Sequence, residues 1–229
     1  MQEFMDELSE LGRDQRYLNS VKQALQKGFN LKLQTVKSDV PIILKSRAYS
    51  QDEVSAIIKF QEDENAFTTR LCLEAGLRAH EALTLERACD LSPAAHREWD
   101  PRLFSFMGPV VLYTVRGKGG LARNVALSID VAAELEMRRL PKPVLRRSRG
   151  INYLSHYAIG GGAGFSQSFS RASSKALGHS RGAHGLRHTY AQRRLQELKS
   201  GGLDTLNAML ILSQELGHFR PDIVLAYLR

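Results

Sequence analysis

The sequence predicts a mainly α-helical α+β protein, in which a small β-hairpin or sheet accompanies several helices. Apolar residues recur at helical spacing along much of the chain, and helix start and stop signals flank these runs. One stretch, VVLYTVRGKGGLARNVALS, instead has two β-rich runs on either side of a glycine-rich turn. The 229 residues are 43% hydrophobic, which is enough for one sizeable core and a small appended unit.

The N-terminal part predicts a short helical element followed by a linker. Leu18, Val21, Leu25 and Phe29 recur at helical spacing, and the polar, basic stretch after them contains Pro41. The pattern SQDE at 50–53 then has the form of a capping box before an amphipathic run, which predicts a helix start. We therefore expect a helical segment and linker over 1–46 and the main domain over 47–229.

The first half of the main domain predicts two helices and a hairpin. The run NAFTTRLCLEA predicts a helix that ends at Gly76, and a second helix is expected to begin near Arg78 or Ala79. The turn of the hairpin falls on residues 117–120, and the helical pattern resumes near Val131.

The second half predicts four more helical segments after a basic stretch. Residues 140–183 hold Lys142, Arg146, Arg147 and Arg149, a glycine run at 160–162 and a helix near 165–177. Helices are expected over 184–199 and 204–216, and Pro221 is expected to start a short one.

The helix predicted over 184–199 places several basic groups together. His184, Arg187 and His188 lie three and four residues apart and therefore share a face. Two turns later, Arg193 and Arg194 are expected on a solvated or phosphate-contacting face without a catalytic role.

The charge balance favours a polyanionic partner. Lysine and arginine total 32 against 24 acidic residues, a formal charge of +8, so nucleic acid is the leading candidate. The two cysteines, Cys72 and Cys89, form no disulfide framework, which favours a reducing compartment. No apolar run reaches membrane-spanning length and the N-terminus is acidic, so we expect a cytoplasmic, nucleoid-associated protein without membrane contact.

Four separated pieces carry a resemblance: AGLRAHEALTL, VRGKGGLARNVAL, AHGLRHTYA and ELGHFRPDIVLAYL. Together they resemble the catalytic domain of the tyrosine recombinase, or phage integrase, family from about Tyr49 to the last residue. The resemblance implies six catalytic residues, with Tyr227 as the nucleophile: Arg78, Lys118, His184, Arg187, His218 and Tyr227. It also implies the family's fold, double-stranded DNA as partner, a 3′-phosphotyrosyl intermediate, and an origin in a phage or other mobile element.

The residue types suit this chemistry in themselves. A tyrosine hydroxyl can form a covalent link that conserves the energy of the phosphodiester bond. Planar guanidinium groups, here Arg78 and Arg187, match the charge of a phosphoryl transition state, with His218 adding a hydrogen bond. Lys118 can protonate the leaving hydroxyl, and His184 can handle the tyrosine proton or support its acceptor. Because the arginines neutralise the charge, no metal or other cofactor is expected.

Each residue also has a plainer interpretation. Arg78 can simply pair with Glu81, Lys118 can be a solvated turn lysine, His218 a helix cap and Tyr227 a packing residue. His184 and His188 can form a metal pair, although no glutamate follows His184 and Arg187 lies between them. The occurrence of all six in one chain, in the expected order, favours the catalytic interpretation.

Two departures from the family pattern shape our expectations. The short segment over 1–46 predicts an incomplete core-binding clamp, with fewer phosphate contacts and weaker binding. Arg229 follows Tyr227 by two residues, which argues against the tetrameric synapse that the resemblance implies. The alternatives are a DNA-binding remnant that no longer cuts, and a type IB topoisomerase-like activity. Both the basic segment 142–149 and the helix at 184 remain candidates for reading bases.

Overall fold

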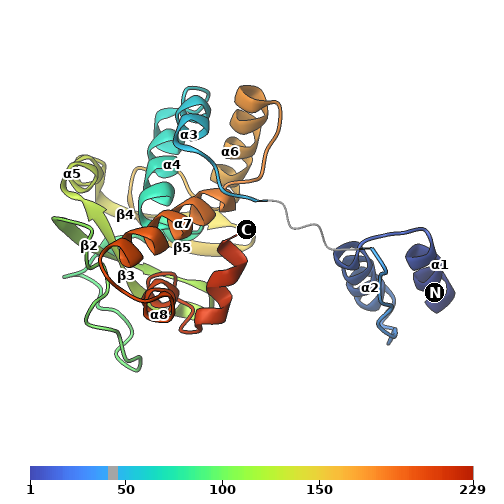
Figure 1. Cartoon of the computed structure of the whole chain (residues 1–229). Helices are drawn as coiled ribbons and strands as arrows, with labels where there is room; N and C mark the ends of the chain where they lie inside the picture. Colours follow the sequence, from blue (N-terminus) through green and yellow to red (C-terminus); the bar gives the residue numbers. More distant parts are fainter. Residues whose placement is uncertain (41–45, 229) are drawn as a thin grey trace. The chain divides into compact units, whose positions relative to one another are not determined.

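The computed structural model describes residues 1–40 and 46–228 of the chain (Figure 1). These residues belong to two compact units, Met1–Lys45 and Ser46–Arg229, which we call the N-terminal and the C-terminal unit. Pro41, assigned to the linker from the sequence, lies outside the described residues. Among the described residues, no helix is both long and apolar enough to cross a membrane.

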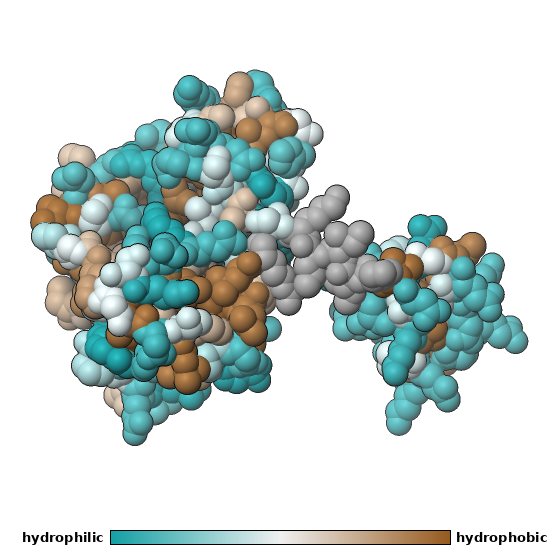
Figure 2. Space-filling model, viewed as in Figure 1, coloured by the Kyte–Doolittle hydropathy of each residue, from teal (hydrophilic) through white to brown (hydrophobic). Residues whose placement is uncertain are grey.

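The N-terminal unit contains two helices, α1 (Gln2–Glu10) and α2 (Gln15–Phe29). The Asp14 carboxylate caps α2 by accepting from the backbone N–H of Tyr17. Met5, Leu8 and Leu18 form a small core. The visible face of this unit is mainly hydrophilic (Figure 2). The predicted helix is confirmed, whereas α1 was not predicted.

The C-terminal unit begins with α3 (Gln51–Ile58), and the predicted capping box is present, because Ser50 and Glu53 bond each other's backbone N–H. Helix α4 (Asp63–Ala75) ends at Gly76, as predicted. Gly76 has a φ of +61°, and a Cβ there would lie 2.5 Å from the ring of Tyr190, so this position requires glycine on two grounds.

The helix predicted to start near Arg78 is wrong. The chain forms only a turn and the 3₁₀ helix η1 (Glu81–Thr84) there. The side chain of Glu81 accepts from the backbone N–H of Arg78 at 2.8 Å, and the Thr84 hydroxyl accepts from the N–H of Arg116 at 3.0 Å. The bond from Arg116 to Thr84 ties the segment to the neighbouring strand, and the chain forms a 3₁₀ turn there instead of an α-helix.

The predicted hairpin is confirmed. Strand β2 (Val110–Arg116) pairs antiparallel with β3 (Ala122–Ser128), and β1 (Glu86–Arg87) adds a short edge to β2. The turn between β2 and β3 is the 3₁₀ segment η2 (Lys118–Gly120), in which Gly119 has a φ of +76°. Helix α5 (Ile129–Met137) follows, as the resumed pattern predicted.

A second hairpin, β4 (Arg139–Ser148) paired with β5 (Ile151–Tyr157), was not predicted. Most of β4 is exposed, so its residues show no alternation between apolar and polar types. The prolines at 141 and 143 further weaken the strand signal in this stretch.

The remaining elements are α6 (Gly162–Leu177), α7 (His184–Ser200), α8 (Thr205–Glu215) and the 3₁₀ helix η3 (Pro221–Tyr227). All four match predicted helical segments. Helix α7 crosses the unit beside α4, and α8 and η3 pack on its other side (Figure 1). The main core lies among α3, α4, α6 and the sheet, and a second core joins α7, α8 and η3. The fold is therefore mainly α, as predicted, with two small antiparallel sheets, of which only the one formed by β2 and β3 was predicted.

Candidate active site

Tyr227 lies at the end of η3, with its ring against α7 and its side chain only 6% exposed. Its hydroxyl lies 3.3 Å from Nε of Arg187 and 3.0 Å from Nε2 of His218. Residues from α7, from the turn after α8 and from η3 therefore converge on one phenolic oxygen.

Arg187 is completely buried at the start of α7. Its Nη1 donates to the carbonyl of Gly76 at 2.5 Å and its Nη2 donates to the carbonyl of Leu216, while Nε faces Tyr227. Burial lowers the pKa of this guanidinium to about 10, which leaves it charged at neutral pH. The backbone ends of α4 and α8 thus fix a permanent cation beneath the tyrosine.

Arg78 and His218 meet at the same site. Nη2 of Arg78 lies 3.0 Å from Nε2 of His218, and because arginine can only donate, the imidazole nitrogen accepts this bond. Burial, followed by the charges of Arg187 and Arg78, lowers the pKa of His218 to about 4. His218 is therefore a neutral acceptor at pH 7, and its accepting nitrogen also contacts the Tyr227 hydroxyl.

Lys118 lies exposed in the turn of the β2–β3 hairpin. It lines a cavity of about 390 Å³ together with Arg78, Arg123 and His218. A neighbouring cavity of about 570 Å³ lies between the two hairpins and also includes Lys118 and Arg78, together with the basic residues Arg116 and Arg149. The hairpin thus places its lysine on the same hollow as two of the other predicted residues.

His184 and His188 flank the tyrosine on the other side. Their ring centroids lie 5.8 Å and 5.0 Å from that of Tyr227 and 5.4 Å from each other. Burial and the charge of Arg187 lower the pKa of His184 to about 4. Over residues 1–40 and 46–228, no group of three or more His, Cys, Asp or Glu side chains is placed to hold a metal ion.

The structure brings the six predicted residues to one region: Arg187, His218 and His184 contact Tyr227. Arg78 bonds His218, and Lys118 shares a cavity with Arg78 and His218. It also assigns the hydrogen bond to the tyrosine hydroxyl to His218, whereas His184 makes a ring contact. The predicted pairing of Arg78 with Glu81 exists as well, at 2.7 Å, so Arg78 takes part in both arrangements.

Two residues of this region were not predicted as part of the site. Glu81 is fully buried and accepts from Arg78 and from Nη2 of Arg123, each at 2.7 Å, with Nη1 of Arg187 at 3.6 Å. Burial alone would raise the pKa of Glu81, but the three arginines lower it far below its usual value. The spacing Arg-x-x-Glu could have revealed Glu81, whereas Arg123 gives no signal among the apolar residues of β3.

The expected solvated position of Arg194 is wrong. Its side chain is completely buried and forms an ion pair with the buried Glu215 at 2.9 Å, while Nη2 donates to the carbonyl of Ser105 at 2.7 Å. Arg193 is partly exposed and pairs with Glu197 on its own helix. Only one of the two adjacent arginines therefore faces solvent.

No protein-family model matches the sequence, and no curated protein sequence matches it. Solved structures do resemble the fold. The XerH site-specific recombinase bound to palindromic difH substrate, in a post-cleavage complex, has a TM-score of 0.56 at 14% identity over 98% of this chain and 65% of that one. The pre-cleavage XerH complex gives 0.51 at 16% identity over 86% of this chain and 54% of that one.

The Tn1549 transposon integrase in complex with circular intermediate DNA gives a TM-score of 0.54 at 15% identity, over 99% of this chain and 79% of that one. This chain thus spans between half and two thirds of the length of the XerH chains. XerH and the Tn1549 integrase are tyrosine recombinases. The chain accordingly has the catalytic-domain fold of the tyrosine recombinases.

Proposed function

We propose that this protein cuts and rejoins DNA at specific sites through a 3′-phosphotyrosyl intermediate formed on Tyr227. The observation that carries the proposal is the convergence on one hydroxyl: Nε of Arg187 at 3.3 Å, Nε2 of His218 at 3.0 Å, and Arg78 bonded to that same imidazole nitrogen. A neutral acceptor and two fixed cations around the hydroxyl of Tyr227 favour a role in phosphoryl transfer over a role as a packing residue.

In the cleavage step, Nη2 of Arg78 turns from Nε2 of His218 to the scissile phosphate, which frees this nitrogen to accept the proton of Tyr227 as the tyrosine oxygen attacks the phosphorus. The bond from phosphorus to the 5′ oxygen breaks, and Lys118 protonates that oxygen to give a free 5′ hydroxyl. Arg78 and Arg187 stabilise the charge that develops on the non-bridging oxygens. Attack by a 5′ hydroxyl on the phosphotyrosyl link reverses the step, and a hydroxyl from another duplex completes strand exchange.

The charge distribution supports DNA as the substrate. The protein carries a formal charge of +8, and the cavity between the two hairpins includes Arg116 and Arg149 beside Arg78 and Lys118. Two of the structural neighbours are complexes with difH substrate and with circular intermediate DNA, and the second is a transposon integrase, in keeping with a role in a phage or other mobile element. We also propose that copies of this protein associate with one another on DNA.

The test is a covalent-capture experiment. Binding sites are first selected from a randomised duplex pool, then rebuilt with a nick next to the scissile phosphate so that the cleaved product diffuses away. Wild type should give a slower band on a denaturing gel, and Tyr227→Phe should give none. Tyr17→Phe, an exposed tyrosine in the N-terminal unit, is the matched control and should behave as wild type.

Other outcomes decide against the proposal. Salt-sensitive DNA binding without a covalent band in wild type would identify a binding protein that does not cut. A covalent band together with relaxation of supercoiled plasmid, but without recombinant products, would identify a topoisomerase-like enzyme.

The same gel tests the role of Lys118. Lys118→Ala should cleave an ordinary duplex slowly but a duplex with a bridging 5′ sulfur much faster, because a thiolate leaves without protonation. An equal defect on both duplexes would remove Lys118 from the acid role.

A further inference from the structure

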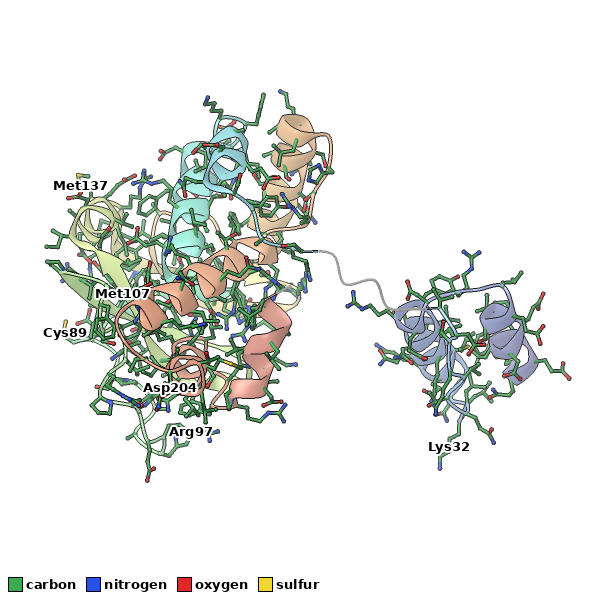
Figure 3. The ribbon with its side chains drawn as sticks, in the orientation of Figure 1. Lys32, Cys89, Arg97, Met107, Met137 and Asp204 are labelled. Atoms are coloured by element: carbon green, nitrogen blue, oxygen red, sulfur yellow. The ribbon has the colours of Figure 1, made fainter. Side chains whose placement is uncertain are left out.

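The loop between β1 and β2, residues 88–109, lies against α8 and its flanking turns. Figure 3 labels Cys89, Arg97 and Met107, which mark its course. The backbone N–H of Asp100 donates to Oε1 of Gln214 at 2.8 Å, and that of Phe104 donates to Oε1 of Glu215 at 3.0 Å. This loop therefore binds the C-terminal end of α8 directly.

The loop also reaches the turn after α8 through aromatic contacts. The ring of Trp99 lies 4.8 Å from that of Phe219, at an angle of 56°, and the guanidinium of Arg97 lies 5.0 Å from the centroid of the same ring. The ring of Phe219 is thus in contact with an aromatic ring and with a cation that both come from the loop.

Phe219 needs such support because its backbone is in the left-handed region, with a φ of +58°. A bulky residue rarely adopts this conformation, and it persists only where surrounding contacts impose it. Phe219 directly follows His218, so its backbone angles set the direction in which the chain leaves the histidine.

A second connection ties the loop to the hairpin that carries Lys118. The indole Nε1 of Trp99 donates to the carbonyl of Ala94 at 3.1 Å, and the N–H of Ala94 donates to the carbonyl of Ala122 at 2.9 Å. Ala122 is the first residue of β3. Trp99 therefore lies on a chain of contacts from the turn end of the hairpin to the turn with His218.

We propose that Trp99 and Arg97 are positioning residues: they hold Phe219 in its left-handed conformation and thereby keep the His218 imidazole against Arg78 and the Tyr227 hydroxyl. The inference rests on the function proposed above for the effect on cleavage. The positioning itself is a property of the folded protein and can be measured without DNA.

The first test is the pKa of His218, measured by NMR on histidine-labelled protein and assigned with His218→Gln. In wild type it should lie well below the ordinary value, because the imidazole is buried beside Arg187, Arg78 and Arg123, with Glu81 opposing them. Trp99→Ala and Arg97→Ala should move it upward, since a displaced imidazole loses burial and these neighbours. A variant that is only less stable keeps the native value.

Arg102→Ala is the matched control for Arg97→Ala. Arg102 lies on the same loop and pairs with Asp100. Within the described part of the chain, the guanidinium that stacks on Phe219 is that of Arg97 and not that of Arg102. It should leave the pKa of His218 unchanged. Arg97→Ala removes a partly solvated side chain, so it keeps the proposal testable even where Trp99→Ala fails to fold.

The second test is single-turnover cleavage of the nicked duplex. Trp99→Ala should slow covalent capture by about 10- to 100-fold with DNA affinity unchanged, a typical cost of a misplaced catalytic group. Trp99→Phe should restore most of the rate, because a smaller ring can still pack on Phe219.

The outcomes separate the two proposals. If wild type forms no covalent link, the proposed function fails while the NMR measurement still decides the positioning role. If Trp99→Ala and Arg97→Ala both leave the pKa of His218 at its wild-type value, the positioning role is overturned whatever the cleavage rates are.

Discussion

Two carboxylates are buried among the described residues of the C-terminal unit, and their surroundings differ. Glu81 and Glu215 are both inaccessible to solvent, and both bind arginine. Glu215 is enclosed: it accepts from the buried Arg194, from the hydroxyl of Tyr190 at 2.9 Å and from the backbone N–H of Phe104. One carboxylate and one buried guanidinium balance each other there, which is typical of a structural ion pair.

Glu81 has a different balance. Three arginines, Arg78, Arg123 and Arg187, surround this single carboxylate. Arg78 and Arg123 also line the cavity shared with Lys118 and His218. A group of three cations and one anion carries surplus positive charge that a buried site tolerates only when an anion can approach. The comparison teaches that burial of an ion pair indicates nothing about function until the charges around it are counted.

The largest effect is expected from Arg187→Lys, which keeps the positive charge beside Glu81 but changes the shape of the side chain that carries it. A lysine cannot reach the carbonyls of Gly76 and Leu216 and the Tyr227 hydroxyl together. Covalent capture should fall by about 10²- to 10³-fold, the usual cost of losing a fixed donor at the reacting group. Arg193→Lys, on the exposed side of the same helix, is the control. A near-normal rate for Arg187→Lys would show that charge alone suffices.

The next effect concerns the Arg194–Glu215 ion pair and should appear as a lower free energy of unfolding. Arg194→Ala leaves Glu215 buried without its main partner, so the free energy of unfolding should fall by about 3–5 kcal/mol in urea titrations. Adding Glu215→Gln should recover part of the loss, because the stranded charge is removed. Arg193→Ala should change stability by less than about 0.5 kcal/mol. If Arg194→Ala changes the free energy of unfolding as little as Arg193→Ala does, the Arg194–Glu215 ion pair does not stabilise the fold.

The smallest effect is a pH dependence of stability to which the histidines around Tyr227 contribute. His184 and His218 have folded-state pKa values of about 4, below the ordinary 6.5. Between these values the unfolded chain binds protons that the folded protein does not, so stability falls as pH drops from about 6.5 to 4. His218→Gln should flatten this part of the profile, whereas His96→Gln, at an exposed position, should not. Identical profiles for wild type and His218→Gln would contradict the assignment.

Local signals predicted much of the fold. Three predicted features depend only on residues that are close together in the sequence, and each is present in the structure: the capping box at Ser50, the helix end at Gly76 and the glycine-rich turn around Lys118. The β4–β5 hairpin escaped prediction because most of β4 is exposed, which removes the alternation on which strand prediction depends.

Long-range partners explain the other differences. Arg194 looks like a surface residue in the sequence because its partner, Glu215, lies on another helix. In place of the helix expected after Gly76, the chain forms the 3₁₀ helix η1, and Thr84 bonds the backbone of β2, a partner that is distant in the sequence. For the site, the order of motifs placed the six residues in one region, but only the structure shows that His218, and not His184, bonds the tyrosine hydroxyl.

The two backbone bonds of Arg187 have a consequence for folding. Its guanidinium reaches the carbonyl at the end of α4 and the carbonyl at the end of α8, which are far apart in the sequence. The cation therefore acquires its fixed position only when both helices have docked on α7. A chain in which only one of these helices has docked would lack one of the two carbonyl partners of Arg187. The alignment of Arg187 on Tyr227 is thus a property of the completed C-terminal fold, which α7 alone cannot supply.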